Sequence, residues 1–366
     1  MKIKKITLTN FRNYQKQTIE LGSGINFIIG ANGEGKTNFL EAIYFLALAK
    51  SYKVNDIDTL KYGEDFAKIQ ASIETNDRLV ELTMIVSEMG KKALINQQEM
   101  KRLSEYIGKL NVVSFLPEDM NLVKGSPRER RYFIDLFLGQ IDKNYLNNLT
   151  KYKYILRQRN ELLKKIAEAE KKDEVLLDVL TEQLAESAYL IMERRVQFIQ
   201  EINELAKKMY YKLSEKEELF EIQYQPSIQG EKINSFLKSK YKTDIYSKMT
   251  NFGPHRDDYD FSLGEYLAKN HASQGEQRMI VLALNMALGE MVFLLKKERP
   301  IFLLDDVFSE LDAKRQNKLI DYLLQSNEQT IITTTSINEI KENILKQAKI
   351  FKVTQGYIKE ERQNGK

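Results

Sequence analysis

The sequence has no cysteine and only two histidines, His255 and His271. Without cysteine the chain can form neither disulfides nor zinc sites with thiolate ligands, which suits a reducing cytosol. Two histidines are also too few for a histidine-rich metal centre. Any metal ion is therefore expected to have oxygen ligands, as Mg²⁺ does.

Long hydrophobic runs are missing as well. The most apolar segment, Met279 to Leu295, is interrupted by Asn285, Gly289 and Glu290, which favours a buried helix over a membrane span. The segment Met1 to Lys5 leads into alternating Ile6, Leu8 and Phe11 and not into a long apolar stretch, so no signal peptide is expected. We expect a cytoplasmic protein without a membrane partner.

The chain also lacks a large excess of charge of either sign. It has 56 basic and 52 acidic side chains, which give a net charge of +4. So small an excess is weak support for a polyanionic partner. The 366 residues, 42% of them hydrophobic and 30% charged, suffice for two compact lobes with a sizeable core.

A glycine-rich segment follows the apolar run Ile25 to Ile29 and precedes a helix with an apolar face. Its residues are Gly30, Ala31, Asn32, Gly33, Glu34, Gly35, Lys36 and Thr37. Strand, glycine-rich loop and helix in this order predict a phosphate-binding loop, whose backbone N–H groups and helix dipole hold the anion. Lys36 is expected to pair with the β- and γ-phosphates, and the Thr37 hydroxyl to bind Mg²⁺. The loop therefore predicts a nucleoside triphosphate with Mg²⁺ as the ligand, and the ATPase elements described next favour ATP.

An acidic pair, Asp305 and Asp306, ends the apolar run Ile301 to Leu304. In isolation such a pair is more often a turn with capping carboxylates. In a chain with a phosphate-binding loop, we expect Asp305 to bind Mg²⁺ directly or through water. Asp306 is then the expected catalytic base, which orients and deprotonates the attacking water.

The segment Ser273 to Arg278 directly precedes the long apolar helix. Taken alone it is typical of an N-cap, since Ser273 with Glu276 three residues later forms a capping box. Beside the phosphate loop and the acidic strand end it instead predicts an ATPase signature, with Ser273, Gly275 and Gln277 at a second anion-binding helix end. A signature of this class acts in trans, which implies a homodimer with the nucleotides between the subunits.

The chain changes character twice along its length. Residues 1–124 are typical of strands and short helices, residues 125–290 are mainly helical, and residues 291–366 return to strands. Strands predicted at Ile301 to Leu304 and Thr330 to Thr334 would join the phosphate-loop strand in one parallel sheet. We expect an α/β core made of the two outer segments, with an inserted helical lobe that carries the signature.

Apolar residues in the helical lobe repeat at helical spacing from Tyr145 to Ile166 and from Leu176 to Met209. The second stripe predicts a helix of about 34 residues, roughly 50 Å long. Such a helix could be an arm that touches DNA or another partner. The stripe is wide for a coiled-coil seam, however, and favours packing into the core of the lobe itself.

Together these motifs resemble the ATPase heads of the SMC and Rad50 class, which have an ABC-type P-loop fold. The segment Asn10 to Tyr14 is part of the match, and the resemblance implies that Arg12 contacts the nucleotide. Three further stretches resemble the RecF recombination-mediator family. They are Pro117 to Asp135, Gly253 to Asp258 and Leu304 to Leu319. The match runs in the family's order from about residue 3 to residue 335.

Two residues depart from these relatives. Asp306 stands where transporter-type and Rad50-type heads carry Glu, and the shorter side chain implies slow hydrolysis. Lys53 stands where the RecF family usually has Arg, which weakens any bidentate phosphate or DNA contact at that position.

The RecF resemblance implies a function in DNA repair, DNA replication and the SOS response. Members form ATP-dependent dimers that bind DNA, favour junctions of single- and double-stranded DNA, and help RecO and RecR to load RecA onto gapped DNA. The resemblance thus implies DNA, RecR and RecO as partners, a location at the nucleoid, and a weak DNA-stimulated ATPase that acts as a switch.

Basic residues at the start of the helical lobe are the candidates for DNA contact. They are Lys124, Arg128, Arg130 and Arg131. They could equally well pair within the chain with Glu129 and Asp135. His255 and Arg256 are expected in an interface or near the nucleotide.

Three other classes of ATPase fit parts of the sequence. An ATP-binding subunit of a transporter would usually have His at the strand end, where Thr333 to Ser336 stand, and a shorter stretch before the signature. A P-loop kinase would need an Arg-rich lid. A chromosome-organising head would need hundreds of residues of coiled coil.

Overall fold

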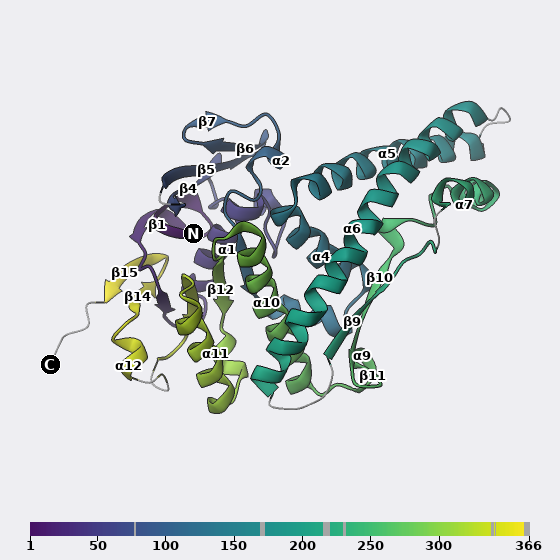
Figure 1. Ribbon diagram of the computed structural model, residues 1–366. Coiled ribbons are helices and arrows are strands. Elements are labelled where there is room, and N and C mark those ends of the chain that lie inside the picture. Colours follow the sequence, from purple (N-terminus) through teal and green to yellow (C-terminus); the bar gives the residue numbers. More distant parts are fainter. Residues whose placement is uncertain are drawn as a thin grey trace. The chain divides into compact units, whose positions relative to one another are not determined.

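The computed structural model describes residues 1–76, 78–168, 173–214, 220–229, 232–337, 340 and 342–361, with residues 309, 310 and 343 described by their backbone alone (Figure 1). Contacts divide the chain into two compact units. Unit 1 comprises Met1–Met120, Lys208–Glu217 and Gln274–Lys366, and unit 2 comprises Asn121–Lys207 and Glu218–Ser273. The contact boundary at Gln274 lies one helix before the lobe boundary predicted at residue 290.

The main sheet of unit 1 has the strand order β15-β14-β3-β13-β12-β8. Its strands are β3 (Ile25–Ile29), β8 (Val112–Phe115), β12 (Ile301–Asp305), β13 (Thr330–Thr334), β14 (Lys349–Thr354) and β15 (Tyr357–Glu361). Neighbours pair in parallel, except the antiparallel pair β14 and β15. The prediction that β12 and β13 join the phosphate-loop strand in a parallel sheet is therefore confirmed. Burial on both faces explains their continuous apolar runs.

A second sheet of unit 1 is antiparallel and has the order β2-β1-β4-β5-β6-β7. Its strands are β1 (Lys2–Phe11), β2 (Tyr14–Glu20), β4 (Phe66–Thr75), β5 (Arg78–Ser87), β6 (Gly90–Ile95) and β7 (Gln98–Glu99). Buried and more exposed positions alternate along β1 and β4, as expected for strands with one face on a core.

Helix α1 (Lys36–Leu48) contacts strands of both sheets, β12 and β13 on one side and β4 and β5 on the other. Phe39, Leu40, Ile43 and Phe45 are fully buried. A helix that is apolar on nearly all sides is stable only when it is covered on all sides. The end of α1 that carries Lys36 is therefore anchored in the core of unit 1.

Helix α10 (Gln274–Lys296) is apolar and long enough to cross a membrane, but 72% of its most apolar window is buried inside the protein. It contacts β8, and a Cβ added at Gly289 would lie 2.6 Å from the Phe302 ring. The prediction of a buried helix here is confirmed. The remaining elements of unit 1 are α11 (Ala313–Ser326) and the short helices η1 (Asp56–Thr59), α2 (Leu103–Tyr106), η2 (Pro117–Met120), η4 (Val307–Glu310) and α12 (Glu342–Leu345).

Unit 2 is mainly helical, as predicted. Its helices are α3 (Asn121–Lys124), α4 (Pro127–Ile141), α5 (Lys143–Glu168), α6 (Glu174–Ser214), α7 (Ile233–Ser239), α8 (Tyr241–Ser247), η3 (Pro254–Arg256) and α9 (Ala268–His271). A small sheet has the order β11-β10-β9, with β9 (Phe220–Gln225), β10 (Asp258–Leu263) and β11 (Tyr266–Leu267). The last turns of α6, from Lys208 on, belong to unit 1.

Helices α5 and α6 run antiparallel and side by side (Figure 1). Arg195 Nε lies 3.1 Å from Tyr145 Oη near one end of the pair, and Arg159 Nε lies 3.0 Å from Thr181 Oγ1 further along. Helix α6 has 41 residues, more than the predicted 34 or so, because it starts before the apolar stripe and continues past it. Leu184, Ile191 and others of the stripe are fully buried, so the prediction that the stripe packs into a core is confirmed.

Candidate functional site

The loop between β3 and α1 depends on glycine at two points. Gly35 precedes α1 with φ 114°, a left-handed conformation that side chains disfavour, and a Cβ there would lie 2.4 Å from Asn13 Nδ2. A Cβ at Gly30 would lie 2.6 Å from the Val353 carbonyl oxygen. Gly33 also has positive φ, and residues 31–33 at the tip are exposed. The loop therefore keeps its backbone open to a ligand.

Asn13 and Tyr14, which follow β1, hold this loop through hydrogen bonds. The Asn13 amide donates to the Glu34 carbonyl at 2.9 Å and accepts from Asn38 Nδ2 at 3.0 Å. The buried Tyr14 hydroxyl donates to the Gly35 carbonyl at 2.8 Å. The sequence places Asn13 and Tyr14 in a motif but gives no sign that they hold the loop, because the contacts span more than 20 residues.

Lys36 is the first residue of α1, and its side chain reaches back to the start of the loop. Its ammonium donates to the carbonyl oxygens of Gly30 at 2.8 Å and Ala31 at 2.9 Å, and the residue is 8% exposed. Burial lowers the pKa of Lys36, while the nearby carboxylates of Asp306 and Asp305 act in the opposite direction. Neutral carbonyls are its only bonded partners among the described residues, so an anion in the loop can take their place.

Asp305 joins the loop to the acidic strand end. Thr37 Oγ1 donates to Asp305 Oδ1 at 3.0 Å, and Thr333 Oγ1 donates to the same oxygen at 2.6 Å. The Asp306 backbone N–H donates to Thr333 Oγ1 at 2.9 Å, and Asp306 has φ 51°. Because β13 lies between β3 and β12, Thr333 near the end of β13 contacts both acidic residues. Thr333 is not among the site residues predicted from the sequence, although its position at a parallel strand end was a signal.

Thr37 and Asp305 offer a hydroxyl and a carboxylate oxygen within hydrogen-bond distance, which is the donor set that Mg²⁺ prefers. Among the described residues, no three Asp, Glu or His side chains group closely enough to hold a metal. A cation bound by Thr37 and Asp305 would thus take its other ligands from phosphate oxygens or water.

Arg12, expected to contact the nucleotide, lies against α1. Its guanidinium forms two bonds of 2.8 Å to the Glu41 carboxylate and one of 3.1 Å to the Asp58 carbonyl. Glu41 is fully buried and also accepts from the Ser51 hydroxyl. Glu41 is not among the site residues predicted from the sequence, although a lone charge in an apolar helix was a signal. Contact of Arg12 with a nucleotide stays a prediction.

The signature residues fall on two sides of the unit boundary. Helix α10 begins at Gln274, directly after Ser273, the last residue of unit 2. Gly275 and Gln277 belong to unit 1, where a Cβ at Gly275 would lie 3.6 Å from Arg315 Nη1 and Gln277 is 4% exposed. The role of these three residues stays a prediction.

Arg130 is a poor candidate for DNA contact. It is 4% exposed and forms a bidentate ion pair with Asp258, at 2.7 and 3.0 Å. Arg131 donates to the Asp257 carbonyl. Both arginines therefore bond within the chain, as one of the two interpretations predicted. Their partners, Asp258 and Asp257, lie in the stretch Gly253 to Asp258 and are not the predicted Glu129 and Asp135.

Lys124 and Arg128 remain exposed. Glu129, suggested as a partner for the arginines, instead accepts from the Ser126 backbone N–H at 2.6 Å and caps α4. The two exposed cations stay candidates for contact with a polyanion.

His255 is bonded on both ring nitrogens inside unit 2. Nδ1 lies 2.6 Å from the Tyr152 hydroxyl, and Nε2 lies 2.9 Å from the Thr250 carbonyl. Burial lowers the pKa of His255 to about 4, so the ring is neutral at pH 7. The partners hold the ring in the core of unit 2, and a role in an interface or in nucleotide sensing stays a prediction.

Comparison with known proteins extends the match to the whole chain. Residues 2–359 match the model of the RecF/RecN/SMC N terminal domain. The chain is 40% identical to the DNA replication and repair protein RecF of Staphylococcus carnosus (strain TM300), over 98% of this chain and 100% of the relative. It is 42% identical to RecF of Geobacillus sp. (strain WCH70), over 96% and 97%.

Solved structures agree in fold. The structure of the recombination mediator protein RecF-ATP in the RecFOR pathway matches with a TM-score of 0.90 and 30% identity, over 98% of this chain and 97% of that one. An SMC head bound to the C-winged helix domain of ScpA matches with a TM-score of 0.57 and 19% identity, over 99% and 97%, and shows the fold alone. The phosphate loop, the acidic strand end and the mixed sheets are thus parts of an ABC-type ATPase head, and the chain belongs to the RecF family of DNA replication and repair proteins.

Proposed function

We propose that the chain binds ATP with Mg²⁺ at the phosphate loop and, as a homodimer, uses ATP binding to hold DNA during recombinational repair. The observation that carries this proposal is the open glycine loop, in which Lys36 is bonded to neutral carbonyls alone among the described residues and Thr37 lies beside Asp305. RecF structures named for ATP share 30% of their residues with this chain over nearly its full length.

In this proposal different residues of unit 1 bind different parts of the Mg²⁺–ATP complex. Lys36 and the backbone N–H groups of residues 30–37 take the phosphates. Thr37 and Asp305 would hold Mg²⁺, which would neutralise negative charge on the phosphates. Thr333 fixes the position of the Asp305 carboxylate through its 2.6 Å bond.

Asp306 is the proposed catalytic base. It directly follows Asp305, and its backbone is fixed by the bond to Thr333. Its carboxylate would accept the proton of the water that attacks the γ-phosphate, so that the products are ADP and inorganic phosphate. The short side chain suits a slow, DNA-stimulated hydrolysis that switches the protein between states.

Ser273, Gly275 and Gln277 are proposed to complete the nucleotide site of the second subunit. They stand at the first turn of a 23-residue helix, whose N–H groups and dipole favour an anion. Closure of the dimer would then require two bound nucleotides, and hydrolysis would reopen it.

The DNA partner is proposed to be gapped DNA or a junction of single and double strands, where the protein would act with RecR and RecO in loading RecA. The likeness to RecF structures from the RecFOR pathway supports this. The protein would accordingly work in the cytoplasm, at the nucleoid.

Lys36→Ala tests the proposal, with Lys16→Ala as the control because Lys16 is an exposed lysine of the same unit. Nucleotide affinity, ATP-dependent dimerisation by sedimentation, and binding to labelled gapped DNA are measured with and without ATP. We expect Lys36→Ala to lose ATP-stimulated dimerisation and DNA binding, and Lys16→Ala to keep both. ATP-stimulated DNA binding by Lys36→Ala would remove the phosphate loop from the mechanism.

A further inference from the structure

The outer face of α5 is basic. Its exposed cations are Lys143, Lys151, Lys153, Arg157, Lys164 and Lys165. The helix has two exposed acidic residues, and both are compensated: Glu161 pairs with Lys164 at 2.9 Å, and Glu168 pairs with Lys248 at 2.9 Å. The face therefore keeps a net positive charge along the whole helix.

The neighbouring helix α6 has the opposite character. Its exposed charged residues from Glu174 to Glu204 are all acidic: Glu174, Glu182, Glu186, Glu193, Glu201 and Glu204. One weak pair, Lys151 with Glu186 at 3.8 Å, joins the two faces. An ordinary solvated surface mixes both signs. Segregation of positive charge to α5 and negative charge to α6 instead favours approach of a polyanion to α5 alone.

Four of the cations form no ion pair within the described residues: Lys143, Lys153, Arg157 and Lys165. We call these four the α5 basic face. They extend over roughly 33 Å at 1.5 Å per residue. Duplex DNA carries about one negative charge per 1.7 Å of its axis, so a helix of this length can reach several phosphates at once.

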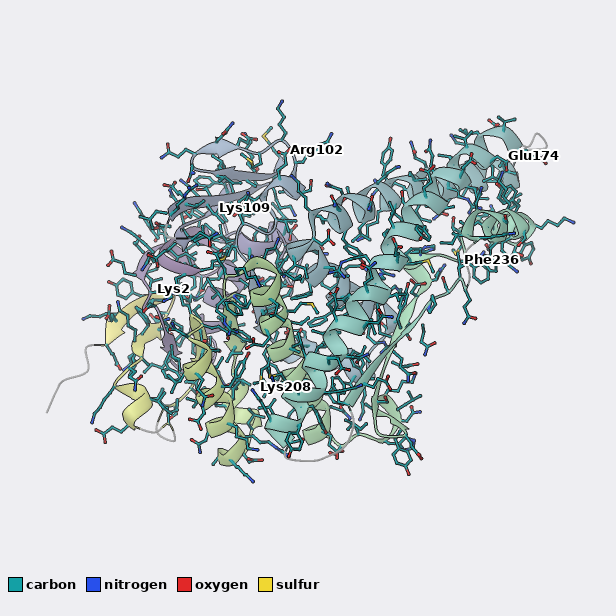
Figure 2. All side chains as sticks on the ribbon, viewed as in Figure 1. Lys2, Arg102, Lys109, Glu174, Lys208 and Phe236 are labelled. Carbon is teal, nitrogen blue, oxygen red and sulfur yellow. The ribbon has the colours of Figure 1, made fainter. Side chains whose placement is uncertain are left out.

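The face suits a duplex better than a single strand. Proteins that hold single strands stack successive bases on several aromatic side chains. The exposed side of α5 has one large aromatic residue, Tyr154, which is 61% exposed. Side chains project from this side of the helix along its length (Figure 2). Long cationic side chains on a rigid helix match a phosphate backbone.

We propose that the α5 basic face binds the phosphate backbone of duplex DNA. The proposal rests on the proposed DNA-binding function and assigns the surface that carries it. Because phosphate contacts carry no sequence information, the face would hold duplex DNA of any sequence. An acidic protein partner on the same face is the competing occupant.

The test is a triple variant, Lys153→Gln, Arg157→Gln and Lys165→Gln, in the full chain. The matched control neutralises two lysines and one arginine that are exposed in unit 1: Lys101→Gln, Arg102→Gln and Lys109→Gln (Figure 2). Binding of a labelled 30-base-pair duplex is measured with ATP over a salt series from about 50 to 200 mM. Nucleotide affinity and Tm are measured alongside.

We expect the α5 variant to lose duplex affinity by on the order of 10²-fold near 0.1 M salt, and its salt slope to fall by about 2 to 3, at roughly 0.9 per phosphate contact. The control should change less than about threefold, and both variants should keep the parental nucleotide affinity and Tm. Equal losses in the two variants, or an unchanged slope in the α5 variant, would overturn the assignment.

Two further outcomes separate the proposals. A parent that shows no ATP-stimulated duplex binding contradicts the proposed function itself. A parent that binds duplex, together with an α5 variant that binds it equally but no longer binds purified RecR or RecO, overturns the DNA assignment in favour of an acidic protein partner.

Discussion

The phosphate-loop site in unit 1 and the charge cluster around Arg195 in unit 2 are both built from charged motif residues, yet they satisfy those charges differently. Lys36 faces two neutral carbonyls, and Asp305 accepts from two hydroxyls. Arg195 is 1% exposed and bonded to the carboxylates of Asp135, at 2.7 Å, and Asp257, at 2.8 Å. In the phosphate-loop site the charged groups are hydrogen-bonded to neutral, dipolar groups. In the Arg195 cluster they form ion pairs with groups of opposite charge.

This difference separates residues available to a ligand from residues used by the fold. A buried charge held only by dipoles can exchange them for a ligand of opposite sign. A buried ion pair with every bond made has nothing to exchange, and removal of one partner leaves the other charge stranded. Variants in unit 1 should therefore alter activity at small cost in stability, and variants of the Arg195 cluster should do the reverse.

Asp257→Ala should have the largest effect. The Asp257 carboxylate accepts from Arg195, from the Tyr224 hydroxyl and from the Ser227 backbone N–H at 2.8 Å. Its removal leaves the Arg195 charge undercompensated in the core, and we expect a loss of about 3–5 kcal/mol in the free energy of unfolding. Urea unfolding of the full chain, followed by circular dichroism, measures this loss.

Asp260→Ala is the control, at a residue of β10, the strand that begins directly after Asp257. Its carboxylate pairs with Lys269 at 2.7 Å, but the lysine side chain is 38% exposed. Such a pair contributes about 0–1 kcal/mol. Comparable losses for the two variants would show that the Arg195 cluster is no more structural than a surface ion pair.

Asp306→Asn should have the next largest effect, and on activity alone. The amide cannot accept the proton of the attacking water, so we expect hydrolysis to fall by about 10²-fold or more while ATP affinity is kept. Asp321→Asn, an exposed carboxylate on α11, should hydrolyse ATP at the parental rate. Phosphate release under saturating ATP gives both rates. Parental hydrolysis by Asp306→Asn would transfer the role of base to another group.

Local order in the sequence explains how much of unit 1 could be predicted. The phosphate loop, its strand and its helix are contiguous, and the parallel strands β12 and β13 show as apolar runs, so their meeting at one sheet edge follows from topology. Thr333 and Glu41 each carry a local signal, but that signal does not name their partners Asp305 and Arg12, which are 28 and 29 residues away.

In unit 2 the ion pairs could not be predicted from local sequence patterns. Arg130 and Asp258 are 128 residues apart, and nothing local indicates that they pair. The basic run around Arg130 has the composition of a nucleic-acid contact, and its burial is a property of tertiary packing alone. The α5 basic face, by contrast, gives no such local signal, since segregation of charge sign between two helices is visible only once they lie side by side.

His255 provides the smallest and most selective test of the comparison. Its pKa is lowered to about 4 in the folded protein, while the unfolded chain should titrate near 6.5. The stabilising contribution of the neutral ring is therefore fully present above pH 6.5, and it is lost as pH falls toward 4, because the unfolded state takes up the proton first. Between pH 6.5 and pH 5 the parent should lose about 2 kcal/mol more than His255→Gln. His271→Gln, at the exposed histidine, should follow the parent.

Nucleotide affinity over the same range should be equal in all three proteins, since the His255 ring is bonded within unit 2 to Tyr152 and Thr250. A pH-dependent difference in nucleotide affinity between His255→Gln and the parent would assign His255 to the nucleotide site and remove it from the structural side of the comparison.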